Sequence, residues 1–166
     1  MELAAHAESL GVDAIAAIPP IYFKLPEHSI AKYWNDISSA APNTDFIIYN
    51  IPQLAGTALT LPLLREMLKN PKVVGVKNSS LPAMDIQMFK YEGTLGGRDF
   101  VVFNGPDEQF VSGFAIGADG GIYCLLQLKK RQCQQFQCLI VTHGQMQFSA
   151  DFLLKVSTYH IFPVKK

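Results

Sequence analysis

The stretch VVGVKNSS, residues 73–80, is a run of small and β-branched apolar residues that ends on a lysine. Val73, Val74 and Val76 favour a strand, and Pro71 and the polar residues after Lys77 bound the run. A continuous apolar run, in place of strict alternation, is typical of a strand with both faces covered. The stretch therefore predicts a buried strand over residues 73–76, with the lysine directly after it.

Four further runs of the same kind occur along the chain. We expect these strands at residues 14–18, 46–49 and 100–103, with a fifth strand opening at 121–122. Apolar residues at helical spacing lie between them, bounded by prolines and glycines. Buried strands that alternate with helices predict an α/β protein with a parallel sheet.

Two of the expected helices have recognisable starts. Thr60 is a typical N-cap residue, and Pro62 follows in the first turn of the helix. Asp107 begins another helix, with Phe110, Val111 and Phe114 predicted to point inward.

Polar residues gather where the strands end. They are Tyr49 and Asn50, then residues 77–79, then residues 104–108. An open nucleotide-binding sheet would usually carry a glycine-rich phosphate loop between a strand and a helix, and neither of the common patterns occurs here. A (β/α)8 barrel instead keeps its chemistry at the carboxyl ends of its strands. The sequence thus favours a barrel.

A lysine at the end of a buried strand has a specific chemical use. A low-dielectric environment disfavours the charged ammonium of Lys77. The neutral amine is a nucleophile toward carbonyl groups, so a Schiff base is its natural product. The alternative is a lysine that reaches solvent or pairs with a carboxylate.

Five segments in order carry a resemblance to a known family. They are AIPPIYF (residues 17–23), IIYNIP (47–52), GVKNSS (75–80), NGPDEQF (104–110) and GADGGI (117–122). With these segments the chain resembles the N-acetylneuraminate lyase and dihydrodipicolinate synthase family of pyruvate-dependent class I aldolases. The resemblance covers residues 2–122 and implies a TIM barrel.

The resemblance also implies catalytic roles. Lys77 would form the pyruvate Schiff base, so no separate cofactor and no metal are expected. Tyr49 would be the phenol that transfers protons at the carbinolamine and at the leaving alkoxide. From the residue alone, Tyr49 would more often be an aromatic side chain of the barrel rim.

The substrate is inferred from the residues that follow the strands. Residues 53–56, QLAG, are similar to the sialic acid lyases, whereas the synthases that use aspartate semialdehyde typically carry an arginine nearby. The resemblance implies that Ser79, Gly105, Asp107 and Glu108 bind substrate, the two acids by accepting hydrogen bonds from a polyol tail. Charge complementing a helix N-terminus is the alternative role for the acids. The favoured reaction is retro-aldol cleavage of N-acetylneuraminate to pyruvate and N-acetylmannosamine.

Other functions stay open at this point. One is a related aldolase or synthase acting on another 2-keto-3-deoxy acid or on aspartate semialdehyde. The other is a non-catalytic remnant that keeps Lys77 and Tyr49.

The resemblance also suggests how the chain is divided. We expect residues 1–122 to form a partial barrel, about strands 4–8 of the family fold, truncated at the N-terminus before the loop that binds the pyruvate carboxylate. Residues 123–166 are expected to be a divergent tail, and the spacing of Phe152, Leu153 and Val156 allows a helix there.

Composition limits the remaining possibilities. The 166 residues have a formal net charge of zero, and the apolar runs are too short for a membrane span, so we expect a cytoplasmic protein without nucleic-acid or membrane partners. Three cysteines, residues 124, 133 and 138, suit neither a disulfide framework nor a metal site. The family resemblance suggests a homo-oligomer, a tetramer.

Overall fold

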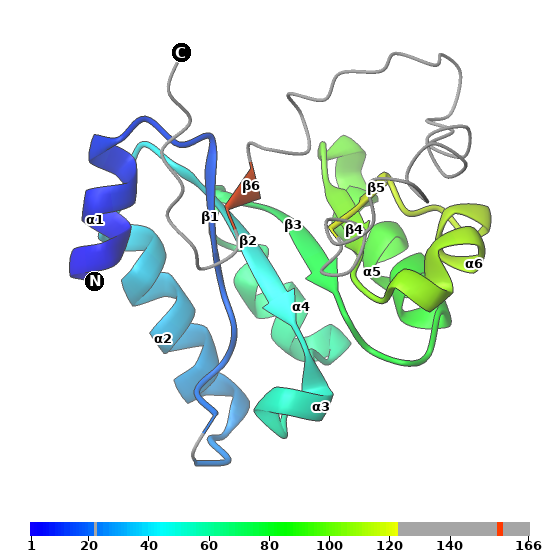
Figure 1. Ribbon diagram of the computed structural model, residues 1–166. Coiled ribbons are helices and arrows are strands. Elements are labelled where there is room, and N and C mark those ends of the chain that lie inside the picture. Colours follow the sequence, from blue (N-terminus) through cyan, green and yellow to red (C-terminus); the bar gives the residue numbers. More distant parts are fainter. Residues whose placement is uncertain (22, 123–155, 158–166) are drawn as a thin grey trace.

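The computed structural model describes residues 1–21, 23–122 and 156–157. Helices and strands alternate through most of this range (Figure 1). The elements are α1 (Glu2–Ser9), β1 (Ala14–Ala17), α2 (Glu27–Ser39), β2 (Asp45–Asn50), α3 (Pro52–Ala55), α4 (Leu61–Met67), β3 (Val73–Asn78), α5 (Met84–Thr94), η1 (Leu95–Gly97), β4 (Val101–Asn104), η2 (Asp107–Gln109), α6 (Phe110–Ala115), β5 (Gly120–Gly121) and β6 (Val156–Ser157).

The strands form one sheet in the order β5-β4-β3-β2-β1-β6, and every pairing is parallel. From β1 to β5 each strand lies beside the one before it, so the strand order never reverses. A doubly wound nucleotide-binding sheet has such a reversal, whereas successive neighbours are the arrangement of a (β/α)8 barrel. The parallel pairing also brings the carboxyl ends of β1–β5 to the same edge.

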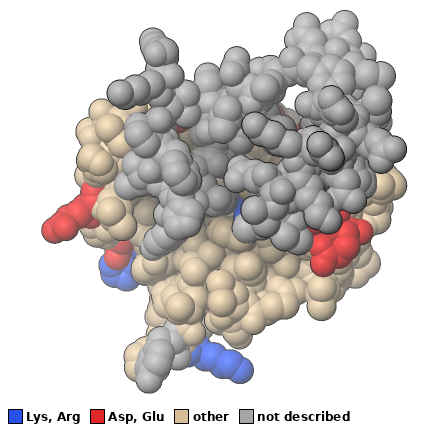
Figure 2. All heavy atoms as spheres, viewed as in Figure 1, with Lys and Arg blue, Asp and Glu red and all other residues tan. Residues whose placement is uncertain are grey.

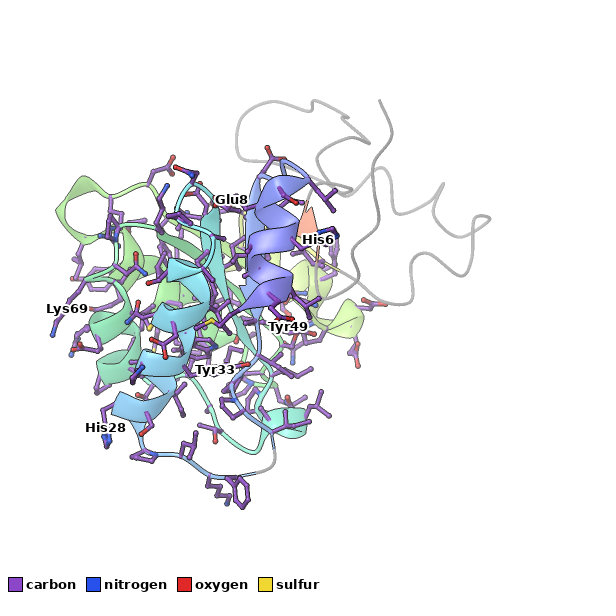
Figure 3. The ribbon with its side chains drawn as sticks, turned by 90° about the vertical axis from the view of Figure 1, so that its left-hand side faces the viewer. His6, Glu8, His28, Tyr33, Tyr49 and Lys69 are labelled. Carbon is purple, nitrogen blue, oxygen red and sulfur yellow. The ribbon has the colours of Figure 1, made fainter. Side chains whose placement is uncertain are left out.

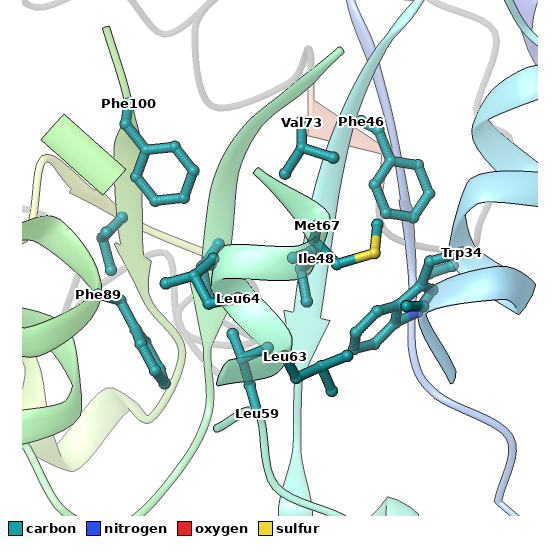
Figure 4. Close-up of a cluster of buried hydrophobic side chains, with 14 of the residues drawn as sticks. Trp34, Phe46, Ile48, Leu59, Leu63, Leu64, Met67, Val73, Phe89 and Phe100 are labelled. Carbon is teal, nitrogen blue, oxygen red and sulfur yellow. The ribbon is translucent and has the colours of Figure 1, made fainter. Parts of the chain in front are cut away.

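Helices α2, α4 and α5 pack side by side behind one face of the sheet (Figure 1). The main hydrophobic core lies between these helices and the sheet, and Figure 4 shows Trp34 and Phe46 at one end and Phe89 and Phe100 at the other. Its largest fully buried side chains are Trp34, Phe46, Phe89, Phe100, Ile30, Ile48, Leu63, Leu64, Met67, Ile86, Val73 and Val76.

The opposite face of the sheet carries a smaller apolar cluster. It centres on Ala14, Ile47 and Phe103, with Val74 and Val101 packed against them. We call this the inner face, because in a barrel the helices lie outside and strand side chains fill the interior.

An irregularity in β3 decides which residues reach the inner face. Phe46 of β2 pairs with Val73, but the next residue, Ile47, pairs with Gly75, so Val74 is an extra residue in the ladder. Val73 and Val76 therefore both contribute to the main core although they are three residues apart. We call this feature the β3 bulge.

Helix α1 is fixed to the start of β2 by Glu8 at its last turn. The carboxylate accepts hydrogen bonds from Asn43 N at 2.8 Å and from Thr44 Oγ1 at 3.1 Å. Figure 3 labels Glu8 near one end of α1, and the label of Tyr49 stands near the other end of this helix in that view.

The structure corrects several expectations from the sequence. Val111 is 60% exposed and does not point inward, because α6 packs through Phe110 and Gly113. The short helix α3 was not predicted, and Val156 lies in a strand, paired with Ala14, where a helix was allowed. The rest of the expected tail, including Phe152 and Leu153, lies outside the described residues, as does Tyr22.

On the face that Figure 2 shows, most of the acidic and basic side chains of the described residues lie at the edges. Within the described residues, no helix is long and apolar enough to cross a membrane.

Candidate active site

Lys77 and Tyr49 lie side by side on the inner face. They are register partners on the adjacent strands β3 and β2. Tyr49 follows Ile47 by two residues, so strand alternation gives it the face of the inner cluster. Lys77 shares that face because of the β3 bulge. In a regular strand of the same length, residues an even number apart point to the same face, so Lys77 would point into the main core with Val73.

The Lys77 amine contacts the face of the Tyr49 ring. Its Nζ lies 3.9 Å from the ring centroid, and the residue is 7% exposed. A cation at this distance is attracted by the ring quadrupole. In residues 1–21, 23–122 and 156–157, the salt bridges found do not include Lys77. Within the described part of the chain, Lys77 therefore neither pairs with a carboxylate nor reaches solvent.

An aromatic residue lies on the other side of Lys77 in the sheet. Phe103 of β4 is the register partner of Lys77 on the other side and is 4% exposed. Among the described residues no salt bridge engages this buried amine, and an amine beside a phenol can act as a nucleophile toward a carbonyl carbon.

Ser79 and Gly105 meet at the carboxyl ends of β3 and β4. A Cβ added to Gly105 would lie 2.0 Å from Ser79 Oγ, and Gly105 N donates to Asn78 O at 2.8 Å. β3 ends at Asn78, so the loop conformation and not strand alternation sets the position of Ser79. The two residues thus lie at the same edge as the lysine, one step further from the sheet.

Asp107 and Glu108 form the first turn of the 3-10 helix η2. Glu108 is exposed and Asp107 is half-buried. Both acids follow β4 at the carboxyl edge, which is compatible with substrate binding as well as with the structural role at a helix start.

Buried carboxamides at the strand ends were not singled out from the sequence. Asn50, Asn78 and Asn104 are register partners across β2, β3 and β4, and they are 2%, 0% and 0% exposed. The recurrence of asparagine directly after Tyr49, Lys77 and Phe103 was the available signal.

Two glutamines hold the loop after β3. With its nitrogen toward Ser79, the Gln53 amide donates to Ser79 O at 3.0 Å and accepts from Leu81 N at 3.2 Å. Gln109 Nε2 donates to Leu81 O from the other side. Loops from three successive strands are thereby connected around Ser79.

No group of three or more His, Cys, Asp or Glu side chains that could hold a metal occurs among the described residues. The cysteines lie outside this range.

The fold and the site together define a segment of a (β/α)8 barrel with a lysine–tyrosine pair at its carboxyl edge. The chain matches the profile of the dihydrodipicolinate synthetase family over residues 1–157. It belongs to that family.

Two relatives of the chain carry the same name, N-acetylneuraminate lyase. The chain is 70% identical over 121 residues to the N-acetylneuraminate lyase of Mediterraneibacter gnavus, covering 73% of this chain and 38% of that protein. It is 34% identical over 121 residues to the Escherichia coli K12 N-acetylneuraminate lyase, covering 73% and 39%. The chain therefore spans about two fifths of the length of these relatives.

Solved structures agree on the fold. The wild-type sialic acid aldolase of Ruminococcus gnavus has a TM-score of 0.71 at 68% identity, covering 75% of this chain and 40% of that one. The Clostridium difficile CdNal structure with mannosamine has a TM-score of 0.72 at 28% identity, covering 84% and 47%. The predicted partial barrel is confirmed, whereas the division at residue 122 stays a prediction.

Proposed function

We propose that this chain supplies the Schiff-base lysine of a carbon–carbon lyase that cleaves N-acetylneuraminate to pyruvate and N-acetylmannosamine. The observation that carries the proposal is the buried Lys77 amine, which lies 3.9 Å from the Tyr49 ring centroid. The names of the relatives support the substrate, and one solved relative is described as a catalytic lysine mutant of a sialic acid aldolase.

The reaction begins at the Lys77 nitrogen. The neutral amine attacks the ketone carbon of the open-chain substrate, and loss of water from the carbinolamine leaves a protonated Schiff base. This cation accepts the electron pair of the bond between the α and β carbons as that bond breaks. The β hydroxyl becomes the carbonyl of the aldehyde product as it loses its proton.

Tyr49 is proposed as the group that moves these protons. Its phenol would give a proton to the departing hydroxyl of the carbinolamine and, as phenolate, take the proton from the β hydroxyl. The enamine left on Lys77 is then protonated on carbon, and hydrolysis of the resulting Schiff base releases pyruvate.

Substrate binding is proposed for the residues beyond the strand ends. Ser79 and Gly105 lie in contact at the same edge of the sheet as the lysine, and Asp107 and Glu108 would accept hydrogen bonds from the polyol tail. We further propose that no separate cofactor or metal takes part, and that the protein is a cytoplasmic homo-oligomer, a tetramer as in the family.

The test is reductive trapping with pyruvate. Borohydride reduces a Schiff base to a stable amine, and peptide mass spectrometry then locates it. We expect an adduct on Lys77 alone in the wild-type chain, none in Lys77→Arg, and an unchanged adduct in Lys72→Arg, which alters the lysine before β3. Absence of an adduct, or labelling spread over several lysines, would overturn the proposed chemistry.

The substrate needs a second experiment. Trapping with N-acetylneuraminate should release N-acetylmannosamine in step with labelling of Lys77. Faster labelling by 2-keto-3-deoxygluconate, or pyruvate-dependent consumption of aspartate semialdehyde, would assign the chain to another branch of the family.

A further inference from the structure

The ends of β2 and β3 are joined by buried side-chain amides. Asn50 and Asn78 come directly after Tyr49 and Lys77, and Asn50 Nδ2 donates to Asn78 Oδ1 at 2.7 Å. A buried carboxamide is costly unless its groups are bonded, so such a pair needs partners on both sides.

The partners extend the pair into a chain of four bonds. Leu59 N donates to Asn50 Oδ1 at 2.9 Å, and Asn78 Nδ2 donates to Ser80 Oγ at 2.9 Å. Ser80 Oγ then donates to Asp85 Oδ2 at 2.6 Å, in the first turn of α5. We call this set, from Leu59 to Asp85, the amide chain.

All donors in the amide chain point the same way. A backbone N–H stands at one end and a carboxylate at the other, and neither can reverse its role. The orientation of both amides is therefore fixed, and each bond polarises the next. A second tie, from Ser79 N to Asn50 O at 2.8 Å, holds the same two strand ends together.

We infer that Asn50 and Asn78 are positioning residues that hold the Lys77 amine against the Tyr49 ring, an inference that rests on the proposed function. Each asparagine points to the opposite face from its neighbour in the strand. A change in the distance between the two amides would therefore change the distance between Lys77 and Tyr49 on the inner face.

The experiment compares the two asparagines of the amide chain with a third asparagine that precedes β3. Asn78→Leu and Asn50→Leu each interrupt the amide chain, while the new side chain has a similar volume and adds no charge. Asn70→Leu is the matched control, because Asn70 precedes β3 and its Nδ2 also donates to a side-chain amide, Asn35 Oδ1, at 2.9 Å. If the leucine variants do not fold, Ser80→Ala replaces them, because it removes only one hydroxyl group from the amide chain.

The primary readout does not use pyruvate. Competitive acetylation of the full chain, read by peptide mass spectrometry, gives the reactivity of Lys77 relative to Lys72, and urea unfolding gives stability. We expect Asn78→Leu and Asn50→Leu to change the relative reactivity of Lys77 by about threefold or more, with the double variant little different from either single one. Asn70→Leu should lose stability without this change.

Equal Lys77 reactivity in all variants would overturn the inference, since a merely structural role affects stability alone. Pyruvate trapping is the second readout, and there the maximal rate should fall while the pyruvate concentration at half-maximal rate stays similar. If wild-type chain forms no adduct, the proposed function fails, whereas the acetylation result still decides the role of the amide chain.

Discussion

At the scale of single residues, the aromatic face of Tyr49 takes the place that a carboxylate would hold beside an ordinary buried lysine. The ring contacts the amine without forming an ion pair with it. A ring face accepts no conventional hydrogen bond in the way that carboxylate oxygens do, so the nitrogen is not held by a carboxylate and can form a new bond to a carbonyl carbon.

Gly105 offers a direct test of how closely β3 and β4 approach. In Gly105→Ala the new Cβ would lie 2.0 Å from Ser79 Oγ and 2.9 Å from Asn78 O. Because short side chains and backbone cannot move aside cheaply, we expect a loss of about 1–3 kcal/mol in the free energy of unfolding, measured with urea.

Removing the opposing side chain is the control for this prediction. The double variant Ser79→Gly/Gly105→Ala lacks the Oγ and Cβ contacts and should regain part of the lost stability. Equal instability in the single and double variants would show that the contact with Ser79 is not the cause.

At the scale of elements, periodicity predicted all five strands of the barrel segment and their order along the chain. Composition alone could not predict the β3 bulge, because it depends on pairing with β2, nor the outward position of Val111. The Lys77–Tyr49 pair was predictable, since parallel strands bring their ends together. The amide chain was not, because its bonds join residues from three separate segments.

Helix α4 gives an element-scale prediction. Thr60 caps it by accepting a hydrogen bond from Leu63 N at 3.2 Å, and its hydroxyl donates to Glu27 Oε1 at the start of α2. Thr60→Ala should therefore lower the free energy of unfolding by about 1 kcal/mol. Thr57→Ala, in the same loop, is the comparison and should unfold at the wild-type urea concentration.

At the scale of the whole molecule, two acids that accept hydrogen bonds, Glu92 and Glu8, link stability to pH. Hydrogen bonds from Arg65, at 2.7 and 2.9 Å, hold the pKa of Glu92 below its usual value of 4.5, outweighing the effect of burial. For Glu8, burial raises the pKa, but hydrogen bonds from Asn43 and Thr44 and the charge of Lys72 together lower it.

The sign of the effect follows from these lowered values. A carboxyl whose pKa is lower in the folded chain contributes stability that is complete above the unfolded value and is lost as pH falls through the folded value. We expect the urea midpoint to be flat from pH 7 to about 5 and to fall below that. The urea midpoint of Glu92→Gln should fall less steeply with decreasing pH below about 5. A slope equal to that of the wild type would show that the Glu92–Arg65 pair does not contribute to the pH dependence of stability.

The β3 bulge makes the gene tolerant of one lost codon at this point. Loss of the Val74 codon would remove the extra residue, so β3 would alternate regularly from Val73 and Lys77 would still lie on the inner face beside Tyr49. The encoded protein would lose one methyl-bearing side chain from the inner cluster and keep the lysine on the same side of the sheet. For this strand, heredity must preserve the lysine more strictly than the length.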